Sequence, residues 1–312
     1  MTFNEDSRVK LPSVLHLNRL GYQYLSLRGA VRDESTNIFT DIFRDSIARI
    51  NPELEAGDID RLLSELRFTL ENEDLGKAFY DRLLDRSGDK IIDFENFDNN
   101  SFHVVTELTY KNGDEEFRPD IIILINGMPL AFVEVKTPNN KGGVMEERTR
   151  INTRFSNKSF RQFANITQLM VFSNNMEYRD DSSLLLVGAF YAAPSYQNHD
   201  FNYFREEESL DMAVLLSAEN EENENHVLKD NNKQMIKHND SEFIPNKEPS
   251  TPTNRLLTSL FSRERLKFVL SYAIAYLKEE NGWQKHIMRY PQFFATKAIE
   301  RKLEAGVRKG II

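Results

Sequence analysis

The chain has 312 residues, of which 40% are hydrophobic, and a formal net charge of −9. This length and composition predict a globular protein with one large or two modest domains, each with a core. Cysteine is absent, which excludes disulfides, thiolate zinc sites and cysteine nucleophiles. The sequence has no apolar run of membrane-spanning length, and MTFNEDSRVK lacks a signal-peptide core, so we expect a cytoplasmic protein without membrane association.

The first hundred residues carry mainly helical patterns. Residues 17–25 suggest a short helix leading into a strand. Apolar residues then recur every three to four positions over residues 34–70, and Pro52 divides this stretch into two helices. Phe79 and Leu83 continue the helical layer.

Strand patterns begin after residue 100. We expect one strand over 102–110, then a turn at 111–114, and then two apolar strands, 121–125 and 130–136, joined at Asn126-Gly127. These three strands should follow one another as a meander. Because alternate side chains on a strand share a face, Glu134 and Lys136 lie together on the last strand.

Charges on a buried strand require an explanation, because burying a charge is costly unless it is paired or holds a metal. Pro119-Asp120, a strand and a turn, and then Glu134-x-Lys136 resemble the PD-(D/E)xK nuclease motif. In that motif Asp120, Glu134 and a backbone carbonyl such as that of Val135 would hold Mg²⁺, and Lys136 would orient or deprotonate the attacking water. The alternative is a surface ion pair between Glu134 and Lys136.

One further acid is a candidate for the same metal site. Glu34 stands at the start of the first long helix, and an acid in that place sometimes completes a site of this type. An acid favoured there by the helix dipole is the commoner arrangement.

The register of the hairpin tests the motif. A two-residue Asn126-Gly127 turn would oppose Asp120 to Val133, and the aspartate would then lie on the wrong face. We therefore expect a three-residue loop, a bulge that uses Gly127, or a bend at Pro119.

The segment after the hairpin is basic, although the net charge of −9 argues mildly against a general nucleic-acid binder. If a helix starts near Val144, three of its arginines share a face that could follow a DNA backbone; a solvated charged face is the commoner alternative. The candidate DNA-binding residues are Lys141, Arg148, Arg150, Arg154, Lys158 and Arg161, of which Arg150, Arg154 and Arg161 share that face.

Two further apolar runs, 166–173 and 184–191, predict central strands, so the fold class is α/β with a mixed β-sheet flanked by helices. Residues 205–254 are acidic and polar, which indicates a connector or a partly mobile insertion. Helical patterns return over 256–277 and 293–303. We therefore expect a first domain over 1–204, the connector or insertion, and a C-terminal helical segment over 255–312.

Several other kinds of site find no support in the sequence. The six histidines show no zinc-ligand spacing, and there is neither a G-x-S-x-G elbow nor a G-x-G-x-x-G turn. A G-x-x-x-x-G-K-[ST] phosphate loop is also missing, so this chain alone should not hydrolyse ATP.

Four segments together resemble the N-terminal nuclease domain of the restriction subunit of type I restriction-modification enzymes. They are NSFHVVTELTY, RPDIIILINGMPLAFVEVKTP, ITQLMVFSNN and RYPQFFATKAIERKLEAG, and the similarity that they carry extends over most of the chain beyond about Asn100. The resemblance implies a restriction-endonuclease-like core with the catalytic set Asp120, Glu134 and Lys136. In that family the last segment leads into an ATP-driven, helicase-like motor, so we expect a fragment or a chain truncated before the motor. Gln292 occupies the position of the adenine-reading glutamine, although a surface glutamine is the alternative.

The resemblance implies a Mg²⁺-dependent endonuclease that cuts double-stranded DNA. A specificity subunit would read the sequence, modification (methyltransferase) subunits would read methylation, and ATP would drive the full-length subunit. The chain departs from the family at its Q-x-x-x-Y element, where it has Ile151 and Phe155, so either Arg150 or Arg154 positions the DNA instead or the helix is placed differently. A catalytically silent module that docks DNA or subunits, and a stand-alone nuclease of another DNA-processing system, remain as alternatives.

Overall fold

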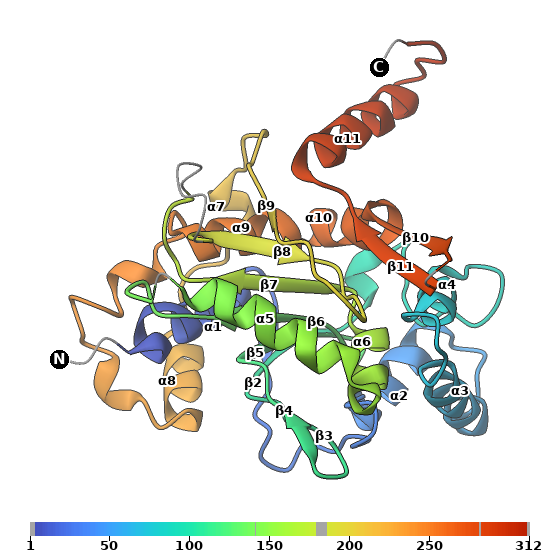
Figure 1. The fold of residues 1–312 in the computed structure, drawn as a ribbon, viewed down its shortest axis with the longest axis horizontal. Coiled ribbons are helices and arrows are strands. Elements are labelled where there is room, and N and C mark those ends of the chain that lie inside the picture. The colour runs from blue at the N-terminus through green and yellow to red at the C-terminus, as the bar shows by residue number, and fades with distance from the viewer. Residues whose placement is uncertain (1–3, 141, 179–185, 281, 311–312) are drawn as a thin grey trace.

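The computed structural model describes residues 4–140, 142–178, 186–280 and 282–310, and these form an α/β fold around a mixed sheet (Figure 1). This confirms the predicted fold class. The strands of the sheet, in spatial order, are β1 (Gln23–Tyr24), β2 (Phe102–Thr106), β5 (Ile121–Ile125), β6 (Met128–Val135), β7 (Leu169–Ser173), β8 (Ala189–Ala192) and β9 (Asn202–Tyr203). The pairs β1–β2 and β6–β7 are parallel, and the other neighbours are antiparallel.

The helices cover both faces of the sheet. Within the described residues they are α1 (Leu11–Arg19), α2 (Thr40–Ile50), α3 (Ala56–Thr69), α4 (Lys77–Leu84), α5 (Gly143–Ser156), α6 (Arg161–Ile166), α7 (Met212–Leu215), α8 (Glu221–Asp230), α9 (Pro252–Phe261), α10 (Arg263–Phe268) and α11 (Tyr290–Glu304). None of them is long and apolar enough to cross a membrane. A π-helical segment, Asp6–Lys10, precedes α1.

Two hydrophobic cores lie on opposite faces of the sheet, because side chains alternate along each strand. On β6, Val133 and Val135 face the core that also holds α1 and α9, whereas Phe132 faces the core that holds α5 and α6. Glu134 is two residues after Phe132 on the same strand and therefore points to the same face of the sheet, the one that α5 covers. Figure 1 shows α5 crossing this face of the sheet.

The predicted meander of three strands is confirmed, but its first strand, expected over 102–110, ends at Thr106. β2 pairs with β5 and β5 pairs with β6, all antiparallel. The chain between β2 and β5 forms a small separate hairpin of β3 (Tyr110–Asn112) and β4 (Glu115–Phe117), so the expected turn at 111–114 closes this hairpin.

The C-terminal helical pattern is interrupted by a hairpin. The expectation of one helix over 256–277 is wrong, because α9 and α10 are followed by β10 (Ile274–Glu279), which pairs with β11 (Gly282–Ile287). Tertiary contacts fix the hairpin: the Tyr276 hydroxyl donates to the Leu75 carbonyl, and the buried Lys285 ammonium donates to the Thr167 carbonyl. α11 then extends away from the body of the molecule (Figure 1).

The acidic segment 205–254 is packed at several points. Glu206 and Glu208 each form an ion pair with Arg265, whose side chain is buried. Val227 and Phe243 are also buried in the core that holds α1. Its interpretation as a connector or insertion stays a prediction.

Candidate functional site

The β5–β6 hairpin places the predicted acids opposite one another. Its turn lies at Asn126-Gly127, as predicted, and has two residues, with φ of 51° and 78°, because Ile125 pairs directly with Met128. Farther along, Ile121 pairs with Val133, so the next pair outward is Asp120 with Glu134. The aspartate therefore lies on the required face.

A β-bulge accounts for this register. Ile123 pairs with Ala131 while Leu124 pairs with Pro129, which leaves Leu130 as the extra residue. Of the three expected solutions, the three-residue loop is wrong, and the structure has a bulge, but at Leu130 and not at Gly127. Proline has no N–H to give to the ladder, so a bulge beside Pro129 costs the sheet little.

The three motif side chains converge at the end of β6. An Asp120 carboxylate oxygen (Oδ2) accepts a hydrogen bond of 2.8 Å from the Val135 N–H, and the Lys136 ammonium (Nζ) donates one of 2.9 Å to the Val135 carbonyl. The distance from Lys136 Nζ to Glu134 Oε2 is 3.7 Å. A surface ion pair is excluded as the explanation, because Glu134 is only 5% exposed.

A fourth charged residue, Glu147 of α5, joins this group. Its carboxylate lies 3.4 Å from Lys136 Nζ, and its side chain is only 3% exposed. α5 can approach so closely because Gly143 has no side chain; a Cβ there would lie 3.0 Å from the Lys136 Cβ. In the sequence, Glu147 lies within the basic stretch after the hairpin, and its spacing of three residues to Arg150 is the signal that could have indicated pairing.

The carboxylates of the site are crowded. Burial raises the pKa of Glu134 well above its ordinary value, and the negative charges of Asp120 and Glu147 raise it further. Burial alone would lower the pKa of Lys136, but the neighbouring Glu134 and Glu147 outweigh it and leave the pKa above its ordinary value. The site therefore attracts positive charge.

The N-terminal segment brings Glu5 to the same edge. Burial raises the pKa of Glu5 to about 6, and Lys136 and Asp120 are its main charged neighbours. By contrast, Glu34 is exposed in a turn ahead of α2. The acid that the fold brings to this edge from the N-terminal part is thus Glu5, a residue for which the sequence pattern gave no signal.

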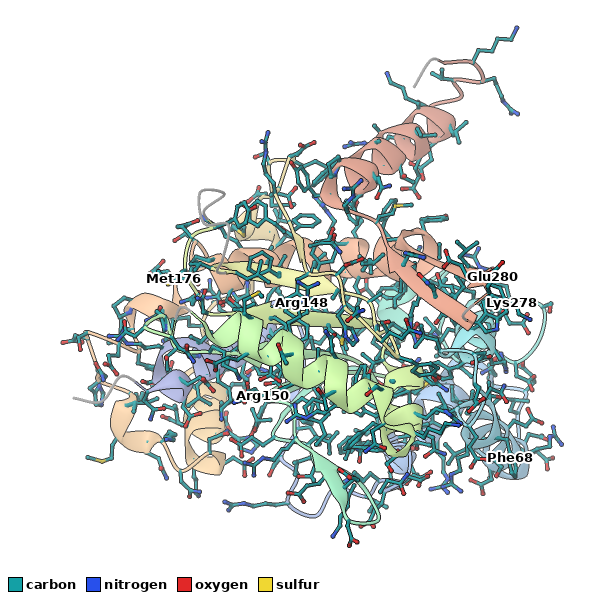
Figure 2. The ribbon with its side chains drawn as sticks, in the orientation of Figure 1. Phe68, Arg148, Arg150, Met176, Lys278 and Glu280 are labelled. Carbon is teal, nitrogen blue, oxygen red and sulfur yellow. The ribbon has the colours of Figure 1, made fainter. Side chains whose placement is uncertain are left out.

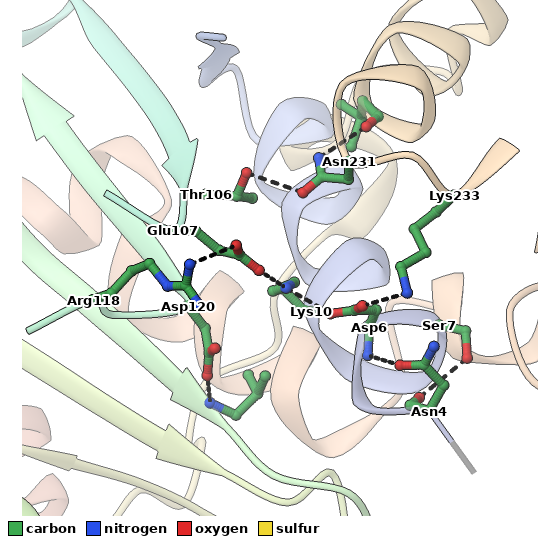
Figure 3. Close-up of polar contacts among 12 residues, drawn as sticks. Asn4, Asp6, Ser7, Lys10, Thr106, Glu107, Arg118, Asp120, Asn231 and Lys233 are labelled. Atoms are coloured by element: carbon green, nitrogen blue, oxygen red, sulfur yellow. Dashed lines mark hydrogen bonds and ion pairs between the residues drawn. The ribbon is translucent and has the colours of Figure 1, made fainter. Parts of the chain in front are cut away.

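An ion network holds the N-terminal segment in place (Figure 3). The buried Lys10 ammonium bridges Asp6, at 2.5 Å, and Glu107, at 2.6 Å. Asp6 also pairs with Lys233, and Glu107 pairs with Arg118, two residues before Asp120. The segment that carries Glu5 is thereby tied to the chain that enters β5.

The donor groups fit a hard divalent cation. Within the described residues, no three His, Asp or Glu side chains come together in a way that could hold a metal ion. A cation at this edge would therefore rest on Asp120, Glu134, the Val135 carbonyl and water. Mg²⁺ binds in this manner, with one or two carboxylates and several retained waters. A cation would also relieve the crowding that raises the pKa of Glu134.

The candidate DNA-binding cations are placed in different surroundings. α5 begins at Gly143, close to the predicted start, and Arg148 and Arg150 leave it on opposite sides (Figure 2). Arg148 donates to the His199 carbonyl (2.9 Å), whereas Arg150 and Arg154 both pair with Glu147.

The remaining cations lie beyond α5 or outside the described residues. Arg161 starts a separate helix, α6, so the prediction that it shares a helix face with Arg150 and Arg154 is wrong. Arg161 and Lys158 both pair with Glu73. Lys141 lies outside the described residues.

The structure also places three other residues that the sequence singled out. Ile151 and Phe155, which stand where the resembling family has glutamine and tyrosine, are buried against the sheet and serve as core residues. Gln292 is exposed at the start of α11 and accepts a hydrogen bond from the Arg289 N–H. It lines a cleft of about 660 Å³ together with Arg148.

Comparisons with known proteins agree with the resemblance. The family model described as "Type I restriction enzyme R protein N terminus" matches residues 2–180. A putative type I restriction enzyme MjaIXP endonuclease subunit from Methanocaldococcus jannaschii is 26% identical over an alignment that covers 97% of this chain and 28% of that protein. A type I restriction enzyme HindI endonuclease subunit from Haemophilus influenzae is 28% identical, with 34% of this chain and 12% of that protein covered. The chain thus spans less than a third of the length of either relative.

Proposed function

Because the chain belongs to the family of type I restriction enzyme R protein N termini, we propose that it is the Mg²⁺-dependent endonuclease region of such a subunit. Its reaction would be hydrolysis of phosphodiester bonds in double-stranded DNA. The observation that supports this proposal is the convergence of Asp120, Glu134 and Lys136 at the buried end of β6. Buried acids and an amine at such a place are costly to the fold, and this cost suggests a chemical role.

Each residue has a role that follows from its position. Asp120 and Glu134 would hold the cation between them with their carboxylate oxygens, and the Val135 carbonyl would supply a third oxygen. Bound Mg²⁺ supplies a Lewis acid and lowers the pKa of its water. Lys136 lies on the same strand face as Glu134 and contacts both Glu134 and Glu147. It would donate hydrogen bonds to the attacking water and to the charge that develops on phosphate.

The wider setting of the reaction is also a proposal. In the full-length subunit, ATP would drive translocation of double-stranded DNA past this site, in the cytoplasm. A specificity subunit and modification (methyltransferase) subunits would complete the complex. Of the candidate DNA-binding cations that the structure describes, Arg148, Lys158 and Arg161 have partners other than Glu147, and these three would contact DNA phosphates.

A metal titration tests the proposal. We expect Mn²⁺, used as a probe for Mg²⁺, to bind the wild-type chain in calorimetry and to show no measurable binding to Glu134→Ala. Glu116→Ala on the exposed strand β4 is the matched control and should bind as the wild type does. Binding to neither the wild type nor Glu134→Ala would contradict the proposal and favour a docking module without catalysis.

The same titration should depend on pH. Burial raises the pKa of Glu5 to about 6, so a proton occupies this carboxyl group in mildly acidic solution, and the raised pKa of Glu134 acts in the same direction. A cation must displace protons there, so its affinity should rise with pH, by about tenfold per pH unit for each proton released. The part of the rise that Glu5 causes is expected around its pKa of about 6. Glu5→Gln should flatten the part near pH 6, and an affinity that does not change with pH would contradict this account.

A further inference from the structure

The Lys136 ammonium lies close to two of the oxygen atoms that would bind the proposed cation. It donates a 2.9 Å hydrogen bond to the Val135 carbonyl and lies 3.7 Å from Glu134 Oε2. An ammonium and a divalent cation repel each other and cannot share these lone pairs. Binding of the cation therefore requires the ammonium to move off the Val135 carbonyl.

Glu147 is the nearest group that could take the displaced ammonium. Its Oε2 is already 3.4 Å from Lys136 Nζ, and among the recorded ion pairs of Lys136 it is the one partner that is not a proposed cation ligand. It also comes from α5 rather than from the hairpin. A small rotation of the lysine side chain would move the ammonium from Glu134 to Glu147, so the ammonium would have a carboxylate partner throughout.

Glu147 is itself held in a fixed position from its other side. Arg154 contacts Oε1 at 3.2 Å and Arg150 contacts Oε2 at 3.3 Å. The Arg154 guanidinium in turn lies over the ring of Phe117, 4.3 Å from the ring centre. Such a buried carboxylate with paired arginines is a rigid acceptor.

We propose that Glu147 is a positioning residue that receives the Lys136 ammonium when a divalent cation takes the Val135 carbonyl and Glu134. This inference rests on the proposed function of the site. Glu147 would hold the ammonium beside the cation and away from the oxygens that bind the cation. From that position the remaining N–H groups of Lys136 can reach the attacking water. Arg150 and Arg154 then serve the lysine indirectly, by orienting Glu147.

Mn²⁺ calorimetry on the full 312-residue chain tests the inference through a double-mutant cycle. Lys136→Ala removes the competitor and should bind Mn²⁺ about tenfold more tightly than the wild type. Glu147→Gln removes the receiving group and should bind it about tenfold more weakly. In Lys136→Ala there is no ammonium to receive, so adding Glu147→Gln should then change the affinity less than about twofold.

Controls separate this role from simple loss of charge or of fold. Glu146→Gln removes the same charge from the exposed neighbouring position on α5 and should leave the affinity unchanged. Thermal unfolding of each variant reports on folding, and Lys136→Ala decides the question alone if Glu147→Gln does not fold.

Two results would overturn the inference while the proposed function stands. One is a Lys136→Ala variant that binds Mn²⁺ no more tightly than the wild type. The other is a Glu147→Gln effect that is as large without Lys136 as with it, because Glu147 would then act on the cation by charge alone. A wild-type chain that does not bind Mn²⁺ would overturn both the inference and the proposed function.

Discussion

Replacing Glu134 with glutamine is expected to lower DNA cleavage by about a thousandfold while leaving the fold at least as stable as that of the wild type. Glutamine keeps the shape of the side chain but loses the charge that would hold the cation. Burial, Asp120 and Glu147 all disfavour a charge at this position. A neutral side chain therefore removes a penalty from the folded state, and the expected changes in activity and stability have opposite signs.

The loss of one ion pair does not reverse this expectation for stability. The Glu134–Lys136 contact is long, at 3.7 Å, and the lysine keeps Glu147 at 3.4 Å. Cleavage of a duplex with Mg²⁺, measured in the full-length protein with its partner subunits, and thermal unfolding of the chain give the two values. Glu116→Gln, on the exposed strand β4, should change neither. Cutting at the wild-type rate would show that Glu134 is not a ligand.

Lys136→Ala separates the roles within the same motif. It should lose cleavage as Glu134→Gln does, because the water and the phosphate lose their hydrogen-bond donor, yet it should keep cation binding. If Lys136→Ala nicks DNA at the wild-type rate, the lysine has no role in the mechanism. That result would not count against the proposed metal site.

The second large effect is expected on stability, from Gly127→Ala in the turn of the β5–β6 hairpin. Gly127 has φ of 78°, and a Cβ there would lie 2.6 Å from the Phe39 carbonyl oxygen and 3.0 Å from the Phe43 nitrogen. Both are backbone atoms, so the start of α2 must move, and the Phe39 N–H would lose its hydrogen bond to the Gly127 carbonyl. We expect a destabilisation of about 3 kcal/mol, the sum of left-handed backbone strain and overpacking.

Gly113→Ala is a matched control in the other hairpin. Gly113 also has a positive φ, of 63°, but a Cβ there would meet no atom within 4 Å. Only the backbone strain remains, so the expected cost is about 1 kcal/mol. Midpoints of urea unfolding measure both variants, and equal shifts would show that the contact with α2 contributes nothing.

The β5–β6 hairpin could be predicted from the sequence because its signals are local. The Asn126-Gly127 turn, the apolar strands and the charged ends were all visible, and the structure has them. The position of the bulge was not predictable, because Leu130 looks like any other core residue and only pairing across the sheet makes it the extra one. The β10 strand was missed for a similar reason: its apolar residues also fit a helix, and β11 decides between the two.

The two acids that complete the site were missed for a different reason. Glu5 and Glu147 come from helical segments outside the hairpin, and tertiary packing decides that they meet Lys136 and Asp120. The periodicity of a sequence shows which residues share a face of one helix or strand. It does not show which side chains from other elements pack against that face. The local motif could therefore be predicted, whereas its electrostatic surroundings could not.

The bulge at Leu130 also determines how this region tolerates gain or loss of residues. Asp120 faces Glu134 because β6 carries one residue more than β5 between the turn and the acids. A one-codon deletion in that interval would invert the aspartate to the opposite side of the sheet, even if every motif residue survived. The length of β6 between the turn and Glu134 therefore matters as much to the proposed site as the identity of the motif residues.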